Sequence, residues 1–319
     1  MSANFGFHTT AEEAAAVLAS QIKGRNVLIT GVSPNSLGFE VARVVAKEGA
    51  GLVIIAGRSK EKLEQTERDI KAETPSANIR ILILDLDSLA AVRAAANEVL
   101  AYPEPLHVLF NNAGIMAIDY RKTVDGHEAQ WGVNYLAHFL FTARIFPKLR
   151  ASASGLPPRI VNVSSNGHAL GPVRFDDIGF SEGEKYDRWE AYGQSKSANI
   201  LFSRELARRG VLSFSVHPGG IMTGISASAP TEDMVKFGIY NEKGEPINNE
   251  HHTWKTLGEG ASTHVVAAFD PTIISQNGSY LVDSKVQDDQ AAPHAKDMGD
   301  AKKLWELSEQ LVGEKFDVV

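Results

Sequence analysis

The chain has 319 residues, 43% of them hydrophobic and 22% charged, which is enough apolar material to bury a large core. Its formal net charge of -7 gives no electrostatic reason to expect nucleic acid or an anionic membrane surface as a partner. Cysteine is absent, which excludes disulfides, thiolate metal sites and a cysteine nucleophile.

The N-terminal stretch, residues 1–25, is expected to form a helical extension packed on the main body. Thr9 or Thr10 can cap a helix there, with Glu12 or Glu13 three residues further on. No basic region followed by an apolar core is present, and no stretch approaches the roughly 20 apolar residues that span a bilayer. We therefore expect no transmembrane segment and a cytoplasmic protein.

Short apolar runs then alternate with longer stretches of helical period. Most runs are continuously hydrophobic, as strands covered on both faces must be. They are NVLIT (26–30), LVIIAG (52–57), IRILILD (79–85), HVLFNN (107–112), RIVNVSS (159–165), LSFSVHPG (212–219) and SYLVD (279–283). The predicted fold class is α/β: a single doubly wound Rossmann-type domain, residues 1–319, with a seven-stranded parallel sheet flanked by helices.

Two further segments are predicted around this core. Residues 224–255 are rich in glycine, proline and asparagine, which indicates a substrate loop or lid. Residues 295–319 are expected to form a C-terminal helix.

The stretch TGVSPNSLG (30–38) links the first strand to the first helix. A glycine turn at that place aims backbone N–H groups and a helix N-terminus at a pyrophosphate. Gly31 permits the tight exit from the strand, and Gly38 lets the helix approach a ligand. Taken alone, the motif fits an ordinary strand-to-helix turn as well as a nucleotide site.

Three further patterns point to a site at the carboxyl edge of the sheet. Tyr192 and Lys196 in YGQSK lie one helical turn apart, so the ammonium could lower the pKa of the phenol toward that of a general acid or base. Ser165 ends a strand, and alternation of side chains favours it over Ser164 as the residue that faces the ligand. Asn134 is an amide in an otherwise apolar run. Each residue also has an ordinary explanation, as a solvated charge, a strand end or a helix cap.

With these motifs together, the chain resembles the short-chain dehydrogenase/reductase family, in the branch of retinol dehydrogenases, WW-domain oxidoreductases and their fungal relatives. The family's glycine motif, its NNAG (111–114) and its PGxxxT, here PGGIMT, are matched in order. Further stretches similar to the branch are SANILFSREL, EGASTHVV, GSYLVDSK and AKKLWELSEQL, so the resemblance covers about the whole chain. One departure is the glycine loop, which is one residue longer and has Ser36 where the middle glycine is expected.

The resemblance implies the residues of the site. The catalytic tetrad would be Asn134, Ser165, Tyr192 and Lys196, with Asn134 holding a water that links Lys196 to solvent. No metal is expected. The residues expected to bind the cofactor are Gly31, Ser33, Ser36, Leu37, Gly38, Arg58, Asp85, Leu86, Asn112, Ala113, Gly114, Tyr192, Lys196, Pro218, Gly219 and Thr223.

The cofactor is expected to be NADP rather than NAD. Enzymes of this fold that prefer NAD place an acid at the end of the second strand, where this chain has AGRSK and the cationic Arg58. The expected activity is hydride transfer between the nicotinamide and a small hydrophobic alcohol or carbonyl compound, with a homo-oligomer possible. Two other classes stay open at this point: a cofactor-binding protein with non-redox or sensing work, and an interaction protein that has kept the fold.

Overall fold

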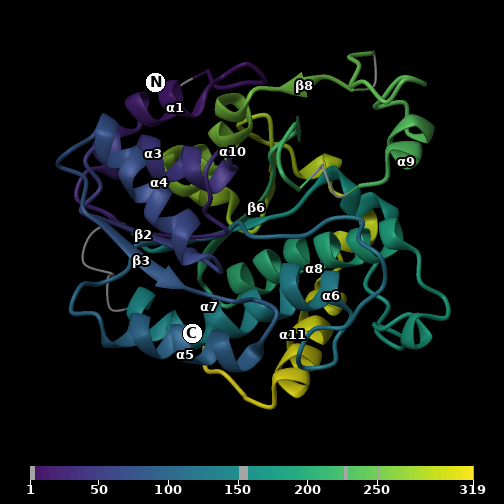
Figure 1. The fold of residues 1–319 in the computed structure, drawn as a ribbon. Helices are drawn as coiled ribbons and strands as arrows, with labels where there is room; N and C mark the ends of the chain where they lie inside the picture. Colours follow the sequence, from purple (N-terminus) through teal and green to yellow (C-terminus); the bar gives the residue numbers. More distant parts are fainter. Residues whose placement is uncertain (1–3, 151–156, 226–228, 250–251, 319) are drawn as a thin grey trace.

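The computed structural model describes residues 4–150, 157–225, 229–249 and 252–318 (Figure 1). Within these ranges the centre is an eight-stranded sheet of order β10-β9-β6-β5-β4-β1-β2-β3. Its strands are β1 Asn26–Thr30, β2 Leu52–Gly57, β3 Ile79–Ile83, β4 Val108–Asn111, β5 Arg159–Val163, β6 Leu212–His217, β9 Tyr280–Val282 and β10 Lys285–Val286. The doubly wound Rossmann-type fold predicted from the sequence is confirmed.

All seven predicted runs become strands, and all seven pair in parallel. The eighth strand, β10, differs from the prediction because it pairs antiparallel with β9. The chain reverses through Asp283 and Ser284, whose φ angles of 52° and 60° lie in the left-handed region. Two residues of strand after a tight turn leave too short a pattern to be recognised in the sequence.

Helices cover both faces of the sheet, as Figure 1 shows. Each face of the sheet has its own hydrophobic core, and strand β1 contributes to both. Leu28 packs with the helices of one face, and Val27 and Ile29 pack with those of the other. On the face of Leu28 lie α5 Leu89–Ala101, α7 Ala137–Arg150, α8 Arg188–Arg208 and α11 Met298–Val312. On the opposite face lie α1 Ala11–Val17, α3 Leu37–Lys47, α4 Lys60–Glu73 and α10 Leu257–Phe269. Burial on both faces explains why these strands are hydrophobic throughout.

The N-terminal extension contains α1 and α2 Ala19–Ile22, and α1 begins with a capping box between Thr10 and Glu13. Helix α11 is shorter than the predicted 295–319, because the side chain of Asp297 caps its start and Gly313 ends it with φ 71°. The remaining helical elements are α6 Ala129–Trp131, the π-helix η1 Gly132–Leu136, and the 3₁₀ helices η2 Asn166–Leu170, η3 Ser181–Gly183, η5 Pro271–Gln276, η6 Asp288–Gln290 and η7 Pro293–Ala295.

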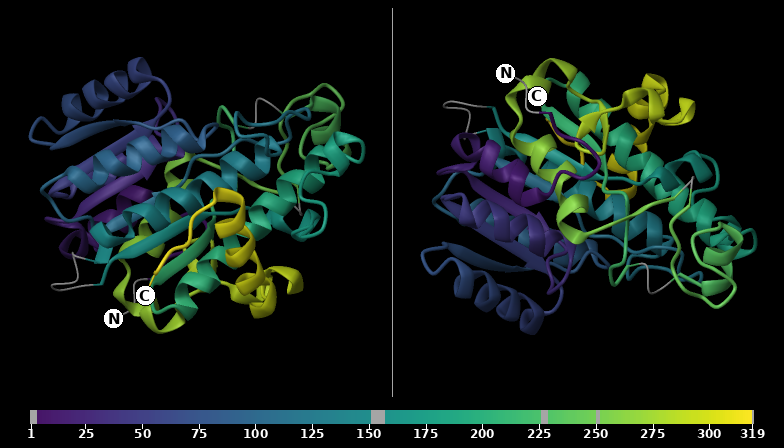
Figure 2. Two further views of the ribbon diagram at one scale, coloured as in Figure 1. Left: turned by 90° about the horizontal axis from the view of Figure 1, so that it is seen from below. Right: turned by 90° about the horizontal axis from the view of Figure 1, so that it is seen from above.

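The predicted substrate loop, residues 224–255, contains regular structure. It includes α9 Thr231–Lys236 and ends in β8 Trp254–Lys255, which pairs with β7 Gly220–Ile221. Both views of Figure 2 place the green part of the chain around α9 at the opposite end of the molecule from the blue α4. The role of this loop and the division of the chain into one domain stay predictions.

No helix among the described residues is long and apolar enough to cross a membrane.

Candidate active site

The glycine turn after β1 packs directly against the turn after β4. A Cβ at Gly31 would lie 2.6 Å from the Cα of Ala113, and a Cβ at Gly38 would lie 2.9 Å from Nδ2 of Asn112. Gly31 also has φ 72°, where other residues are strained. Asn112 holds the two turns together by donating from Nδ2 to the carbonyl of Thr30 at 2.7 Å. Glycine is therefore required at 31 and 38 by this close approach.

Thr30 is a residue of this junction that the sequence analysis did not single out. Its hydroxyl accepts hydrogen bonds from the backbone N–H groups of Asn112 and Ala113, each at 3.0 Å. Its Oγ1 also lies 2.9 Å from Nε2 of His138 on α7. The only signal was its place at the strand end, immediately before Gly31.

Ser36 replaces the expected middle glycine and closes the loop with its side chain. Its hydroxyl caps α3 by accepting from the N–H of Phe39 at 3.1 Å, and it donates to the carbonyl of Ser33 at 2.7 Å. Leu37 begins α3 and lies 3.2 Å from a Cβ placed at Gly260 of α10. The loop thus delivers the N-terminus of α3 to the carboxyl edge of the sheet, where the fold binds anionic groups.

Tyr192 and Lys196 lie on α8, both nearly fully buried, with Nζ of Lys196 5.6 Å from the centre of the Tyr192 ring. Nζ donates to the carbonyl of Val163 at the end of β5, at 2.9 Å. Ser165 follows β5, and its Oγ lies close to the Tyr192 ring: a Cβ at Gly167 would lie 3.3 Å from Oγ of Ser165 and 2.8 Å from Cε1 of Tyr192. Ser164 points elsewhere: its hydroxyl donates to the carbonyl of Lys196 at 2.8 Å. The two serines therefore have the opposite orientations that strand alternation predicts.

The protonation of the pair differs from the sequence-based expectation. Burial raises the pKa of Tyr192 to about 12, and the hydrogen bond from Ser165 acts in the lowering direction. Burial also lowers the pKa of Lys196 to about 7. Lys196 was expected to lower the pKa of Tyr192, but a lysine that is itself half neutral near pH 7 has little charge with which to do so. In the cofactor-free protein, desolvation dominates both groups.

Asn134 lies inside the π-helix η1, a type of helix that is frequent at functional sites. Its Oδ1 accepts from the N–H of Ile115 at 2.8 Å, and its Nδ2 donates to the carbonyl of Ile115 and to the hydroxyl of Ser195, both at 2.9 Å. The amide therefore joins the segment after NNAG to α8. Both of its hydrogens are used, so a water held by this side chain would have to donate to the second lone pair of Oδ1.

Gly114 brings the two halves of the site together. A Cβ there would lie 3.2 Å from Oδ1 of Asn134, 3.5 Å from Nζ of Lys196 and 3.7 Å from Cδ1 of Ile225. A side chain at this position would therefore crowd Asn134 and Lys196. Ile225 was not named among the predicted site residues, although it lies in the predicted substrate loop, residues 224–255.

The predicted adenine-side residues lie at the ends of neighbouring strands. Arg58 follows β2; it is exposed and makes no hydrogen bond or ion pair with the described part of the chain. Asp85 lies beyond β3, is half-buried, and accepts from the N–H of Asp87 at 3.0 Å. Leu86 is buried in the core.

Pro218, Gly219 and Thr223 follow β6 at the same edge of the sheet. Gly219 has φ 91°, and a Cβ there would lie 2.7 Å from Cδ of Lys255. Lys255 is buried beneath this turn: its Nζ pairs with Asp283 at 2.6 Å and lies 4.3 Å from the centre of the Phe7 ring. The conformation of PGG is thus fixed by a lysine that the sequence analysis passed over.

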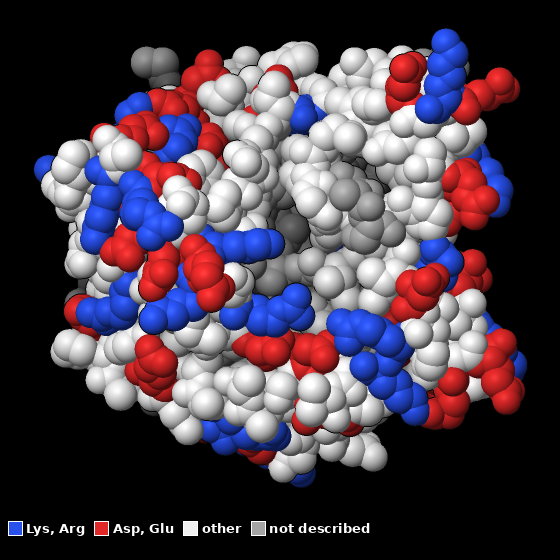
Figure 3. Space-filling model, viewed as in Figure 1, with Lys and Arg blue, Asp and Glu red and all other residues white. Residues whose placement is uncertain are grey.

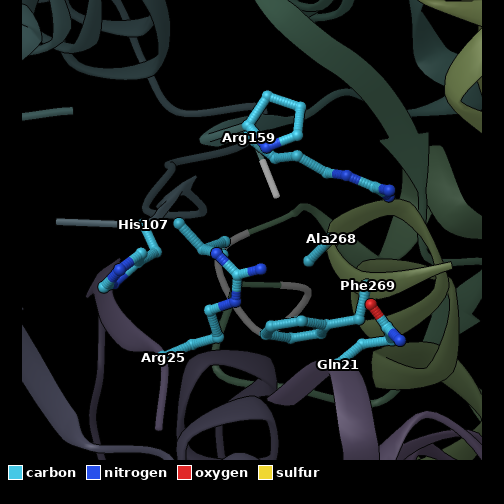
Figure 4. Close-up of a pocket in the computed structure, with 8 residues that line it drawn as sticks. Gln21, Arg25, His107, Arg159, Ala268 and Phe269 are labelled. Atoms are coloured by element: carbon cyan, nitrogen blue, oxygen red, sulfur yellow. The ribbon is translucent and has the colours of Figure 1, made fainter. Parts of the chain in front are cut away.

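Figure 3 shows the molecular surface hollowed between the part over β2 and α4 and the part around α9. A separate small cavity of about 20 Å³ lies at the other edge of the sheet, where β4 and β5 begin, and has room for about one water (Figure 4). It is lined by Gln21, Arg25, His107, Val108, Pro157, Arg159, Ala268 and Phe269. The predicted catalytic residues lie at the carboxyl edge and take no part in it.

Comparison with known proteins supports the same assignment. The family profile described as short chain dehydrogenase matches residues 25–176. Mouse retinol dehydrogenase 12 is 36% identical over 302 residues, which cover 93% of this chain and 89% of the relative. The chain belongs to the short-chain dehydrogenase family. The predicted resemblance to this family and to retinol dehydrogenases is confirmed, and with it membership of a family of nicotinamide-dependent oxidoreductases.

Other known proteins are similar over comparable lengths. The short-chain dehydrogenase/reductase prx1 of Penicillium rubens is 36% identical over 301 residues, covering 90% of this chain and 84% of the relative. A solved structure from Mycobacterium paratuberculosis is 32% identical with a TM-score of 0.69, covering 93% of this chain and 96% of the other. The NADPH-bound carbonyl reductase from chicken fatty liver shares the fold, with 22% identity, a TM-score of 0.58, and coverage of 83% and 99%.

Proposed function

We propose that the chain is an NADP(H)-dependent oxidoreductase that transfers hydride between the nicotinamide and a hydrophobic alcohol, ketone or aldehyde. The observation that carries the proposal is the group of Ser165, Tyr192 and Lys196. The serine hydroxyl lies beside the ring of Tyr192, and Nζ of Lys196 lies near both the Tyr192 ring and Gly114. A serine hydroxyl and a phenol side by side at the carboxyl edge of the sheet are suited to holding a carbonyl oxygen and supplying its proton.

The chain's own residues provide the proton chemistry. The bound nicotinamide supplies the hydride in reduction. Tyr192, kept protonated by its raised pKa, gives its proton to the carbonyl oxygen, while Ser165 donates a hydrogen bond that holds that oxygen in place. Lys196 would bind the ribose hydroxyls through Nζ beside Gly114, and its charge in the loaded site would stabilise the phenolate that forms. In oxidation Tyr192 takes the proton back as a base.

The residues fit the cofactor. The glycine turn leaves the N-terminus of α3 at the sheet edge, and no side chain at Gly114 comes between the turn after β4 and Nζ of Lys196. Arg58 supports NADP over NAD, because its exposed guanidinium is uncommitted among the described residues and no acid lies at the end of β2 to repel a 2′-phosphate. The hydroxyl of Ser59, by contrast, is engaged in capping α4 and in bonding Glu61.

A hydrophobic substrate is supported by two exposed apolar side chains in the part of the chain that follows β6. Met222 and Phe237 are 53% and 46% exposed. A small hydrophobic carbonyl or alcohol as partner, a homo-oligomer and a cytoplasmic location stay predictions.

The experiment is turnover by the wild type and by Tyr192→Phe with NADPH and a panel of carbonyl compounds, followed by absorbance of the reduced nicotinamide. Phenylalanine keeps the ring packing but cannot carry a proton, so kcat should fall by about 10²–10⁴-fold. Cofactor affinity, from fluorescence titration, should change little. A variant that keeps more than about a tenth of wild-type kcat contradicts the role of Tyr192. A wild type that binds NADPH but reduces none of the panel points instead to a non-redox or sensing protein.

A further inference from the structure

We propose that Trp189 determines substrate size preference by holding the α9 segment, residues 229–249, against the catalytic helix. This inference rests on the proposed function, because it concerns the compounds that reach Tyr192. Trp189 precedes Tyr192 by three residues on α8, so both side chains lie near the same face of that helix.

Trp189 makes both of its contacts with the α9 segment through its indole. The indole N–H donates to Oδ2 of Asp233 at 2.9 Å. The ring meets the ring of Phe237 edge to face, with centres 4.9 Å apart and planes at 86°. A hydrogen bond to a carboxylate and an aromatic pair are both stronger than average contacts.

Helix α9 depends on such contacts for its position. It has six residues, too few for a helix to be stable by itself in water. Met234 is its one fully buried apolar residue within the described chain, at 4% exposure. The hydrogen bond and ring contact from Trp189 are therefore a large share of what fixes it.

Trp189 also lies next to Tyr192. The Trp189 and Tyr192 rings lie 6.5 Å apart, centre to centre, at 89°. Trp189 is thus within ring-contact distance of both Tyr192 and Phe237, and Phe237 is 46% exposed. Tyr240, also of the α9 segment, contacts the sulfur of Met222 with its hydroxyl at 3.7 Å. In the proposed arrangement, the exposed side chains of Met222 and Phe237 and the ring of Trp189 are the apolar surface on which a substrate would lie.

This arrangement predicts a dependence on chain length. The non-reacting part of a long apolar substrate can lie on this surface, whereas a three-carbon compound bound at Tyr192 cannot reach it. Each buried methylene can add up to about fourfold to kcat/KM. Loosening the α9 segment should therefore lower kcat/KM for long substrates and leave kcat/KM for short substrates nearly unchanged.

The test compares the wild type with Trp189→Phe, Asp233→Ala and the double variant. Glu232→Ala is the matched control, because Glu232 is the neighbouring acid on α9 and is exposed. With NADPH, kcat/KM is measured for straight-chain aldehydes from propanal to decanal. Each single variant should lose about 10- to 100-fold for decanal, the change expected for one charge-assisted hydrogen bond, and less than about threefold for propanal.

The double variant should lose no more kcat/KM for decanal than either single variant, because the two residues act through one hydrogen bond. Glu232→Ala should behave as the wild type. Three results would each overturn the inference. In the first, a single variant loses kcat/KM equally for propanal and decanal; in the second, the losses of the two single variants add in the double variant. In the third, both single variants keep the chain-length profile of the wild type.

An activity-independent measurement separates this inference from the proposed function. Calorimetric binding of 1-octanol and 1-propanol is recorded for the same proteins. If the wild type reduces no aldehyde, the proposed function fails, and the inference is judged on binding alone. Selective loss of octanol binding in both single variants, with no larger loss in the double variant, supports it; wild-type octanol binding in the single variants refutes it.

Discussion

Replacing Lys196 by methionine should remove a pH dependence from the stability of the cofactor-free protein. Methionine is similar in length and apolar, so it can fill the buried space of the lysine stem. Burial lowers the pKa of Lys196 from 10.5 to about 7 in the folded protein. In the unfolded chain the lysine returns to its ordinary pKa. Between these two values the unfolded state binds the proton and the folded state does not.

The direction follows from that difference in bound protons. Where the unfolded state holds more protons, the free energy of unfolding rises with pH, by at most about 1.4 kcal/mol per pH unit for one group. From pH 7, where the folded lysine is half protonated, to pH 9, the two pKa values give a rise of about 2 kcal/mol. Below pH 7 both states are protonated and the contribution becomes constant.

The assay is urea unfolding of the wild type and of Lys196→Met at pH 7, 8 and 9, without cofactor. Groups that titrate alike in both proteins cancel when their free energies of unfolding are subtracted. From pH 7 to pH 9 the free energy of unfolding of the wild type should therefore rise by about 2 kcal/mol relative to that of the variant. Lys60→Met is the control, since the Lys60 side chain is 70% exposed and should show no such gain. A constant difference between wild type and Lys196→Met would mean that the buried lysine is charged at neutral pH.

Three further changes test separate parts of the site. Ser165→Ala should cut kcat severely, whereas Ser164→Ala should act mainly on the free energy of unfolding, because the Ser164 hydroxyl bonds only the backbone of α8; equal kinetic losses would show the wrong serine was chosen. Arg58→Ala should weaken NADPH binding by roughly one to two orders of magnitude and barely change NADH binding, by titration of both cofactors; tighter wild-type binding of NADH contradicts the NADP assignment. Gly31→Ala should destabilise by on the order of 2 kcal/mol more than Gly210→Ala, a glycine of φ 82° with no atom within 4 Å of its Cβ position, in parallel urea melts; equal costs would mean that Ala113 moves aside freely.

Much of the fold could be predicted because local pattern and tertiary structure agree. Strands buried on both faces leave unbroken apolar runs, and Ser36, Ser59 and Ser88 each cap the helix that the sequence predicts after them. The motifs also indicated which residues meet at the carboxyl edge, because that edge collects the ends of parallel strands.

Contacts between distant segments could not be predicted in this way. Nothing local to Trp189 reveals that its indole meets Asp233, and nothing local to Lys255 reveals its position under Gly219. The pKa of Tyr192 was expected to fall, because the spacing of the sequence shows that Lys196 lies one helical turn away. The sequence does not show how deeply Tyr192 is buried, and this burial raises its pKa. Desolvation depends on all the residues that pack around an ionisable group, and the spacing of residues in the sequence does not predict that packing.

The burial of Lys255 bears on the order in which the chain can fold. Its partners Phe7, Gly219 and Asp283 come from the two ends and the middle of the chain, and an ammonium is costly to bury before its carboxylate arrives. Bringing together segments so far apart in sequence is slow, because their loops must close first. The PGG turn therefore becomes fixed late, and a nascent chain cannot complete the proposed cofactor site before β9 and the turn that follows it emerge.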